Sequence, residues 1–248
     1  MKTAKNILGV AVALAMTASG TFAAPVMISQ LPYQITVSGD YILDPAAVAQ
    51  PVSTGIAIQI TASDVNLELS GQQIDCQAGV YGIVVGSYPY ANTNVNHVSI
   101  NNGTVNAVNQ DPVVGLLIGA YSSHVSIQGL DVTGNFYGSL DFGNNTSLKN
   151  CTFQSPLAIL PNPGPGNSTY EHLTVTTNPY SSGLNAGSPY EKVALLSLGY
   201  NNSFKNITVV AGDVQLSATD TYKNFFVQPT TQVFRGGAPV TTSMGSNP

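Results

Sequence analysis

The chain has 248 residues and a formal net charge of −5; only 8% of its residues are charged, whereas 43% are hydrophobic. A negatively charged chain with one arginine releases few counterions from a phosphate backbone, so nucleic acid is excluded as a partner and polyanionic sugars are disfavoured. Val, Ile and Leu recur regularly, which argues against disorder and predicts one packed domain.

The first 23 residues have the order of a secretory signal peptide, with Lys2 and Lys5, an apolar run over residues 7–16, and small residues up to Ala23. The apolar run is shorter than the ~20 residues that cross a bilayer, and no later stretch reaches that length, so no transmembrane segment is expected in the mature chain. Cleavage after Ala23 leaves five basic and twelve acidic residues. We expect a protein that is secreted, or located at the cell surface or in the periplasm, behind a leader of bacterial type.

One six-residue pattern recurs through the chain: apolar, polar, Asn or Gly, variable, polar, apolar. Residues 100–105 (INNGTV) and 204–209 (FKNITV) are representative copies. The spacing between copies varies, which indicates strands in a common register joined by loops of different length. The copies begin at Leu69, Ile100, Ile127, Leu148, Tyr170, Phe204 and Tyr222.

Short apolar strands bracketed by glycines fall between these copies, over residues 82–86, 115–119 and 138–143. No segment of helical length shows a 3.6-residue period, so all elements are predicted to be strands. A unit of about 20 residues cannot bury its own apolar face, but stacked units share a continuous core. A sandwich of hairpins would need two-residue turns and longer alternating strands, and the sequence favours neither.

Residues 31–43, 58–67 and 97–105 resemble the N-terminal cap and the coil signatures of right-handed parallel β-helix proteins, the pectate-lyase-like superfamily. The resemblance implies an all-β, single-domain right-handed parallel β-helix, a solenoid of about seven coils with an N-terminal cap. It is specific for the fold and says little about activity, because such folds host many functions.

The same resemblance divides the chain after the leader into an N-terminal strand and cap over residues 24–54, a parallel β-helix over residues 55–228, and a flexible tail over residues 229–248. A repeat protein needs a capped end to avoid edge-to-edge association, and the tail has no charged cap. Self-association through the C-terminal end is therefore one interaction to test.

The polar positions of the motif form rows across the predicted coils. The third position is Asn or Gly in most copies, and these residues are predicted to form tight turns, because both tolerate left-handed backbone angles. At the second position Lys149, Glu171 and Lys205 alternate in sign, which predicts weak ion pairs on the surface.

Cys76 and Cys151 are the two thiols of the chain. Export would permit a disulfide, but the register places them three coils apart, roughly 14 Å along the axis at the strand spacing. A disulfide joins Cα atoms within ~7 Å of each other. We predict two free, buried thiols.

The motifs of the superfamily's enzymes are absent from the sequence. Pectate-lyase-like members use an acidic calcium cluster with a basic residue, and the polygalacturonases carry Asn-Thr-Asp, paired Asp, Gly-His-Gly and Arg-Ile-Lys strings. None of these strings occurs, and the single arginine, Arg235, lies outside the repeats. No cofactor and no metal ion are predicted.

His97 and His124 occupy equivalent places, three residues before a motif, and are predicted to stack on adjacent coils. Two imidazoles could act as acid and base near neutral pH or bind a metal ion. In the predicted register, Asn66 precedes them in the row, and the row has no carboxylate. This favours the alternative, in which both are turn residues.

Asp131 and Asp141 are the candidate carboxylates for glycoside hydrolysis, which normally uses two of them about 5 to 9.5 Å apart. The register places Asp131 on an outward motif position and Asp141 in a glycine-bracketed strand. The two are expected on different faces, which disfavours a working pair.

Tyr88, Tyr90 and Tyr121 follow glycines that close strands, as does Tyr200. Tyr88 and Tyr121 are predicted to project from the same turn of neighbouring coils, near the two histidines. Exposed tyrosine rings suit neutral sugars or protein surfaces, and the alternative is that they cover loop backbone.

Two functions are compatible with these features. The first is an exported, non-catalytic β-helix scaffold, a surface or adhesive protein that contacts polysaccharide, such as neutral glycans, or a cell-surface protein. The second is a carbohydrate-active enzyme (a polysaccharide lyase, an epimerase or a glycoside hydrolase) with a non-standard active site. The lack of a catalytic set favours the first.

Overall fold

The computed structural model describes residues 24–77, 79–86, 93–107, 114–134, 137–155, 157–159, 166–176, 193–227 and 232–239. These residues form strands and one short 3-10 helix, Pro45–Val48, so the predicted all-β class is confirmed. Within these ranges, no helix has the length and apolar character needed to cross a membrane.

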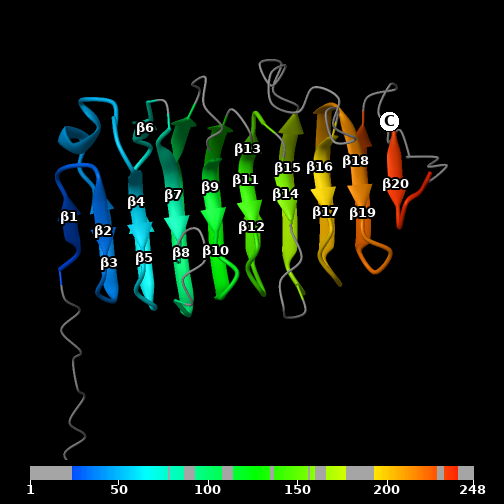
Figure 1. Ribbon diagram of the computed structural model, residues 1–248, viewed down its shortest axis with the longest axis horizontal. Coiled ribbons are helices and arrows are strands. Elements are labelled where there is room, and N and C mark those ends of the chain that lie inside the picture. Colours follow the sequence, from blue (N-terminus) through cyan, green and yellow to red (C-terminus); the bar gives the residue numbers. More distant parts are fainter. Residues whose placement is uncertain are drawn as a thin grey trace, which may run out of the picture.

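The strands form two sheets that run along the whole length of the molecule (Figure 1). The eleven-stranded sheet contains β1 (Val26–Ile28), β3 (Gly39–Leu43), β5 (Val65–Glu68), β6 (Gln73–Asp75), β8 (Val95–Ala107), β10 (Ser122–Gly134), β12 (Ser147–Lys149), β13 (Thr152–Phe153), β15 (Thr169–Thr176), β17 (Ser203–Ala211) and β19 (Thr221–Val227). The ten-stranded sheet contains β2 (Tyr33–Ile35), β4 (Ile56–Ile60), β7 (Tyr81–Val85), β9 (Val114–Ile118), β11 (Tyr137–Asp141), β14 (Leu157–Ile159), β16 (Val193–Ser197), β18 (Asp213–Leu216), β20 (Val233–Arg235) and β21 (Ala238–Pro239).

The chain passes back and forth between the two sheets, and strands that are neighbours in a sheet come from successive passes. Pairing is parallel throughout both sheets except between β20 and β21. Ile100 of β8 pairs with Ile127 of β10, and Ile127 pairs with Leu148 of β12, as the motif register predicted. This arrangement is compatible with a parallel β-helix.

The apolar motif positions point between the sheets. Ile100, Val105, Ile127 and Val132 are fully buried, and one cluster of buried apolar side chains extends from β1 to β20. In the C-terminal half the same column becomes aromatic, with the rings of Tyr170 and Phe204 stacked at a centroid distance of 4.9 Å.

The predicted turn row is confirmed. Every third-position residue has a positive φ, including Asn206 at 55° and His172 at 54°. An L-residue in this region is strained by about 1–2 kcal/mol unless its side chain finds a local partner, which explains the repeated Asn and Gly. The Asn side chains also bond along the row, for example from Asn224 Nδ2 to Asn206 Oδ1 at 2.8 Å.

The predicted register is wrong at the first motif copy. Leu67, and not Leu69, pairs with Ile100, whereas Ile74 pairs with Val105 as expected. Glu68 pairs with Asn101 and Gln73 with Thr104, so β5 and β6 are separated by two residues more than the equivalent positions of β8. Ser70 and Gly71, both with positive φ, form the extra turn that absorbs this insertion.

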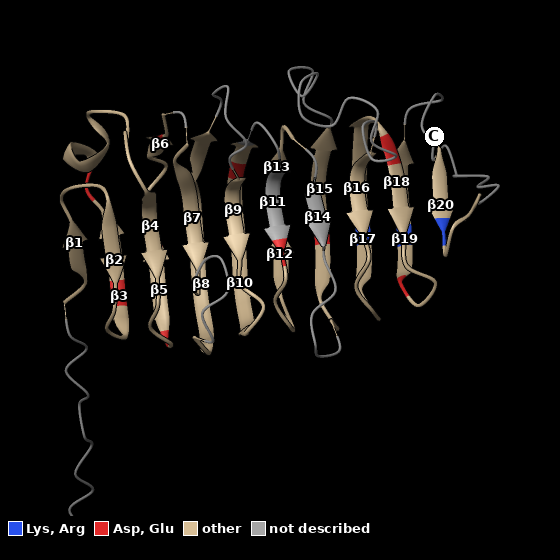
Figure 2. Cartoon of the chain, viewed as in Figure 1, with Lys and Arg blue, Asp and Glu red and all other residues tan. Residues whose placement is uncertain are grey.

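The predicted surface ion pairs are present in the second-position row. Lys205 Nζ lies 2.6 Å from Glu171, and Lys149 Nζ lies 3.9 Å from the same carboxylate. The hydrogen bond and the charge of Lys205 lower the pKa of Glu171. Charged side chains are otherwise few and scattered over the described strands (Figure 2).

Neither cysteine is in a disulfide, and both are buried, as predicted. Cys151 lies on an inward position of the turn between β12 and β13, where its thiol faces the backbone carbonyl of Lys149 at 3.3 Å. Burial raises the pKa of Cys76 to about 12 and that of Cys151 to about 11. Both thiols therefore stay protonated and unreactive at neutral pH.

Both ends of the stack differ from the sequence-based division. At the N-terminal end β1 and β2 already pair in parallel with β3 and β4, and the main path of the eleven-stranded sheet holds nine strands in succession where about seven coils were predicted. The first two strands of this path, β1 and β3, lack the six-residue motif, so the motif copies did not include them. At the other end β20 and β21 lie within the segment expected to be a flexible tail, and β20 pairs with β18.

Candidate functional site

The predicted histidine pair is formed. His97 and His124 lie in register on β8 and β10, both with positive φ, and their rings stack at a centroid distance of 5.1 Å with an interplanar angle of 30°. Both φ values identify them as corner residues, in agreement with the turn interpretation. The side chain of His97 is 64% exposed, so the pair lies on the surface.

The expectation that this row has no carboxylate is wrong. Asp64, rather than Asn66, precedes His97 in the row, because the register of β5 differs by two residues from the predicted one. The carboxylate of Asp64 lies 3.3 Å from Nδ1 of His97, and the hydroxyl of Ser123 lies 3.1 Å from Nδ1 of His124. The row thus begins with a carboxylate and two imidazoles. No group of three or more His, Cys, Asp or Glu side chains in the described ranges could hold a metal ion.

The two candidate carboxylates lie in different sheets. Asp131 is exposed on β10, whereas Asp141 ends β11 and is only 1% exposed. The Asp141 carboxylate accepts hydrogen bonds from the Tyr170 hydroxyl at 2.6 Å, the Gly143 amide at 2.8 Å and the Thr146 hydroxyl at 3.2 Å. Burial raises its pKa to about 6, although these bonds lower it. A carboxylate enclosed in this way supports the core and cannot reach an external substrate.

Sequence reasoning missed the buried polar column to which Asp141 is joined. The residue two places before each motif start is Val98 and Val125 in β8 and β10, but it becomes polar in later strands while remaining buried. The polar members are Thr146, Ser168, Asn202 and Asp220. This change from Val to polar residues is visible in the sequence once the motif is aligned.

The side chains of the last three polar members each accept a hydrogen bond from the backbone N–H of the member before them. Ser168 Oγ accepts from the Thr146 amide at 3.0 Å, Asn202 Oδ1 from the Ser168 amide at 3.2 Å, and Asp220 Oδ1 from the Asn202 amide at 3.0 Å. Asp220 also accepts from the Ser197 hydroxyl at 2.6 Å, and burial raises its pKa. The column therefore satisfies turn amides inside the core and is structural.

Of the predicted tyrosine strip, Tyr121 lies within the described residues. Tyr88 and Tyr90 lie outside the described residues. Tyr121 and Tyr200 are exposed, at 44% and 53% respectively.

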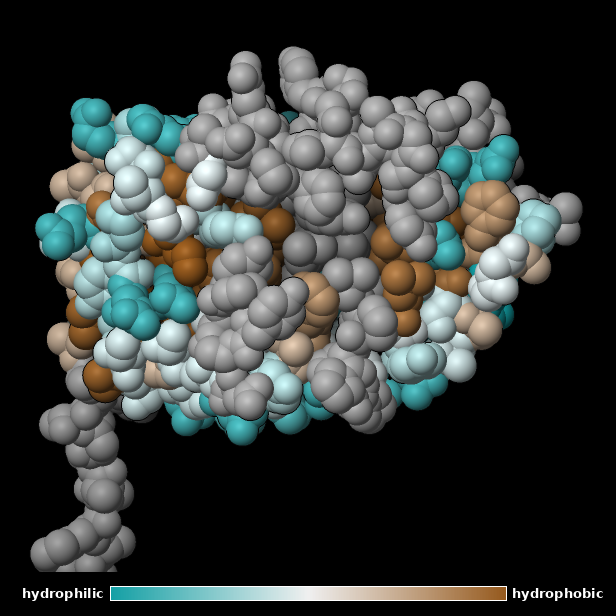
Figure 3. Space-filling model, viewed as in Figure 1, coloured by the Kyte–Doolittle hydropathy of each residue, from teal (hydrophilic) through white to brown (hydrophobic). Residues whose placement is uncertain are grey.

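The outer face of the ten-stranded sheet carries a second apolar layer that the sequence analysis did not separate from the core. Val84, Val114 and Leu117 form a buried cluster distinct from the main one, with Ile56 and Tyr81 packed against it. Figure 3 shows apolar side chains gathered on one face of the molecule between polar margins. The unbroken apolar runs 83–85 and 116–118 could have indicated this second layer. Strands that are buried on both faces lose the alternation of apolar and polar residues.

Toward the C-terminal end of this sheet the outward positions become polar and aromatic. Leu196 pairs with Gln215, and Gln215 pairs with Phe234, so the three form one outward column on β16, β18 and β20. Val193 pairs with Asp213 in the adjacent column. These positions open into a cavity, here called the Phe234 cavity, lined by Val193, Asp213, Gln215, Gln232, Phe234 and Gly237.

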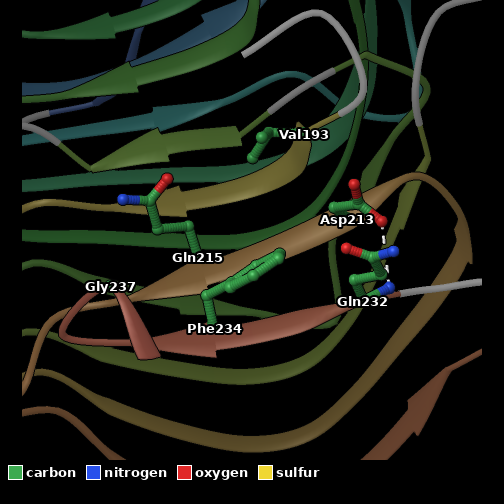
Figure 4. Close-up of a pocket in the computed structure, with 6 residues that line it drawn as sticks. All are labelled: Val193, Asp213, Gln215, Gln232, Phe234 and Gly237. Atoms are coloured by element: carbon green, nitrogen blue, oxygen red, sulfur yellow. Dashed lines mark hydrogen bonds between the residues drawn. The ribbon is translucent and has the colours of Figure 1, made fainter. Parts of the chain in front are cut away.

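The Phe234 cavity combines one aromatic face with several hydrogen-bonding groups. Figure 4 shows the Phe234 ring between Gln215 on one side and Asp213 with Gln232 on the other. Its volume is about 320 Å³, near the lower end of small-molecule sites. The backbone N–H of Gln232 donates to Asp213 Oδ1 at 2.9 Å, which orients the carboxylate. This site was not predicted from sequence, since Phe234 lies in the segment expected to be a flexible tail.

Comparison with protein-family models, with curated proteins and with solved structures finds no match for this chain.

Proposed function

We propose that this protein is a secreted, right-handed parallel β-helix that binds neutral saccharides in the Phe234 cavity without converting them. The right-handed helix extends the observed parallel pairing: a parallel strand–crossover–strand connection is right-handed in nearly all proteins. Secretion rests on the leader-like first 23 residues. The proposal agrees with the resemblance to pectate-lyase-like proteins in fold, and departs from their catalytic motifs.

The observation that carries the proposal is the composition of the Phe234 cavity. An aromatic ring offers a flat apolar surface for the C–H face of a sugar, and the amides of Gln215 and Gln232 can both donate to and accept from its hydroxyls. Asp213 adds an acceptor for two hydroxyls. The described cavity lining contains no basic side chain that would pair with a sugar acid, and the chain as a whole is negative. These features favour a neutral saccharide over a uronic acid polymer.

The experiment is binding of neutral and acidic oligosaccharides on a glycan array, followed by calorimetry on the neutral ligands that bind. Phe234→Ala should weaken binding about ten-fold or more, a loss of ~1.4 kcal/mol or more. Phe226→Ala is the matched control, because Phe226 is an exposed phenylalanine of β19 in the other sheet. Equal binding by both variants, or a preference for acidic sugars, would contradict the proposal.

A second candidate function, a carbohydrate-active enzyme, is favoured by one observation. The Asp64 carboxylate lies 3.3 Å from His97, which stacks on His124, so a carboxylate–imidazole pair is present on the surface. Such a pair can move protons near neutral pH. A polysaccharide panel read by reducing-end release and by absorbance of unsaturated products tests this candidate. If the protein turns over a polysaccharide and His97→Ala abolishes that turnover, the protein is an enzyme and the non-catalytic binding function is wrong.

A further inference from the structure

A second cavity opens against the ten-stranded sheet at the end of the stack opposite to the Phe234 cavity. It lies beside β2 and β4, the first two strands of this sheet, whereas the Phe234 cavity lies beside its later strands β18 and β20 (Figure 1). Its volume is about 280 Å³. The residues that line this site, here called the Gln34 cavity, are Pro32, Tyr33, Gln34, Gly55, Ile56 and Gln59.

The two cavities lie at the two ends of one outward column of the sheet. Gln34 of β2 pairs with Gln59 of β4, and Gln59 pairs with Val84 of β7. Val84 belongs to the outer apolar layer, so the two glutamines also lie on the outward side of their strands. From Val84 the pairing continues strand by strand to Gln215 and Phe234.

Among the described strands, polar side chains occur in this column only at the two cavities. Between them the column runs through Val84, Leu117, Leu140, Ala158 and Leu196. Val84, Leu117 and Leu196 are buried. Aliphatic side chains on β4 and β18 would continue this apolar row, yet both strands carry a glutamine there. The positions of the glutamines therefore follow the cavities and not the packing of the outer layer.

The Gln34 cavity offers several hydrogen-bonding groups to a ligand. Gln34 is exposed, and within the described part of the chain its side chain forms no hydrogen bond. Gln59 Nε2 donates to the backbone carbonyl of Gly86 at 3.4 Å, and this bond leaves the side-chain oxygen Oε1 as an acceptor. A Cβ atom at Gly55 would have no heavy atom within 4 Å apart from its chain neighbours, so the space beside this backbone is open. Each glutamine amide can both donate and accept hydrogen bonds.

The lining of the Gln34 cavity, as far as the structure describes it, has no charged side chain. A charged ligand would lose hydration there without gaining an opposite charge, so a neutral ligand is favoured. The side chains of Tyr33, Pro32 and Ile56 suit the C–H face of a sugar, and the two glutamine amides suit its hydroxyls. An aromatic side chain and two glutamines line the Phe234 cavity as well.

We propose that the Gln34 cavity is a second binding site for neutral saccharides, which makes the protein bivalent. This inference rests on the proposed function, because it assigns to the second cavity the ligand class of the first. Gln34 and Phe234 are eight strand steps apart in the column, which corresponds to about 38 Å at the usual strand spacing. A trisaccharide is too short to reach both cavities, so it binds to each of them independently.

The test is a titration of the isotope-labelled exported chain with neutral trisaccharides of glucose, mannose and galactose, followed by the amide chemical shifts in NMR spectra. A trisaccharide that binds should shift two separate sets of amides. One set surrounds Gly55 and Ile56, and the other surrounds Gln232 and Phe234. This shift map of the unaltered chain does not depend on the folding of any variant.

Two double variants then test the glutamines. Gln34→Ala with Gln59→Ala removes both amides from the Gln34 cavity and should weaken that site about ten-fold, while the Phe234 cavity keeps its affinity. The matched control is Gln73→Ala with Gln128→Ala, which removes two glutamines from the eleven-stranded sheet. Unchanged thermal unfolding of both double variants shows that a loss of binding comes from the cavity and not from the fold.

Bivalency has its own readout with a long polysaccharide built from the preferred sugar. After the first cavity has bound, the second contact forms at a high effective concentration. The unaltered chain should therefore bind the polymer at least about ten-fold more tightly than either Phe234→Ala or the Gln34→Ala, Gln59→Ala variant. Equal affinity of all three for the polymer would overturn the bivalent arrangement.

The outcomes separate this inference from the proposed function. Amide shifts confined to the surroundings of Phe234 would overturn the second site and leave the proposed function in place. Shifts confined to the surroundings of Gln34 would support the second site and contradict binding in the Phe234 cavity. The absence of shifts at both cavities with every trisaccharide would overturn both proposals.

Discussion

The hydroxyl of Tyr170 donates a 2.6 Å hydrogen bond to the carboxylate of Asp141, and both side chains are buried in the core. Asp141 is the last residue of a glycine-bracketed strand of the ten-stranded sheet, whereas Tyr170 begins a copy of the apolar motif in the eleven-stranded sheet. The bond therefore links the two sheets through a group whose charge depends on pH.

The stability of the protein should fall as pH rises through the titration of Asp141. Its folded pKa, about 6, lies above the ordinary aspartate value of 3.8, so the folded state binds the proton more tightly than the unfolded state. The contribution of Asp141 is complete below pH ~4 and lost by pH ~7, a change of about 3 kcal/mol. Urea unfolding at several pH values measures it. Asp141→Asn should lack this decline, and Asp131→Asn, an exposed control, should keep it.

Tyr170→Phe should destabilise the protein most at neutral pH. It removes one of three donors to a buried carboxylate and leaves the packing against Phe204 in place. The free energy of unfolding should fall by about 1–3 kcal/mol at pH values above the pKa of Asp141. The fall should be smaller in acid, where the carboxyl group is neutral. Because that hydrogen bond lowers the pKa of Asp141, the decline in stability should also move to higher pH. A loss of the same size at pH 3 and pH 8 would contradict the role of the charged bond.

Asn206 should tolerate glycine better than alanine. Its φ of 55° lies in the left-handed region, which strains an alanine by about 1 kcal/mol or more and leaves glycine unstrained. Asn206→Gly should lose only the side-chain bonds to His172 and Asn224. Thermal unfolding of Asn206→Ala and Asn206→Gly measures the difference. Alanine equal to or better than glycine would show that this corner is not left-handed.

Cys76 and Cys151 should be unreactive in the folded protein. Both are buried and outside any disulfide, and burial raises both thiol pKa values above 10. An aromatic disulfide reagent at pH 8 should label neither thiol in native protein and both after unfolding in urea. Rapid labelling without denaturant would place a thiol at the surface, and labelling of neither thiol after unfolding would indicate a disulfide.

Much of the strand arrangement was predictable from the motif. The period placed Ile100, Ile127 and Leu148 in one column, and Asn at the third position predicted the left-handed corners, because few other residues accept that backbone. The same alignment predicted that the two cysteines do not form a disulfide. It failed at Leu67, because a two-residue insertion at a turn leaves the apolar pattern intact and shifts its register.

The candidate sites depended more on tertiary structure. Asp64 reaches His97 only through the corrected register, and Phe234 meets Gln215 only because β20 pairs with β18. A short segment rich in Gly, Pro and Thr gives no local signal for such a strand. Its pairing is decided by the edge that the preceding strand leaves open.

The amino-acid sequence by itself determined the strand period, the inward and outward sides of each motif and the residues at the corners, since these depend on local backbone geometry and on alternation. Only the tertiary structure decided which polar groups are buried. The sequence of the glycine-bracketed strand that ends in Asp141 does not indicate whether this last side chain points outward or inward. Its environment comes from Tyr170 and Thr146, which the chain brings to it on later strands.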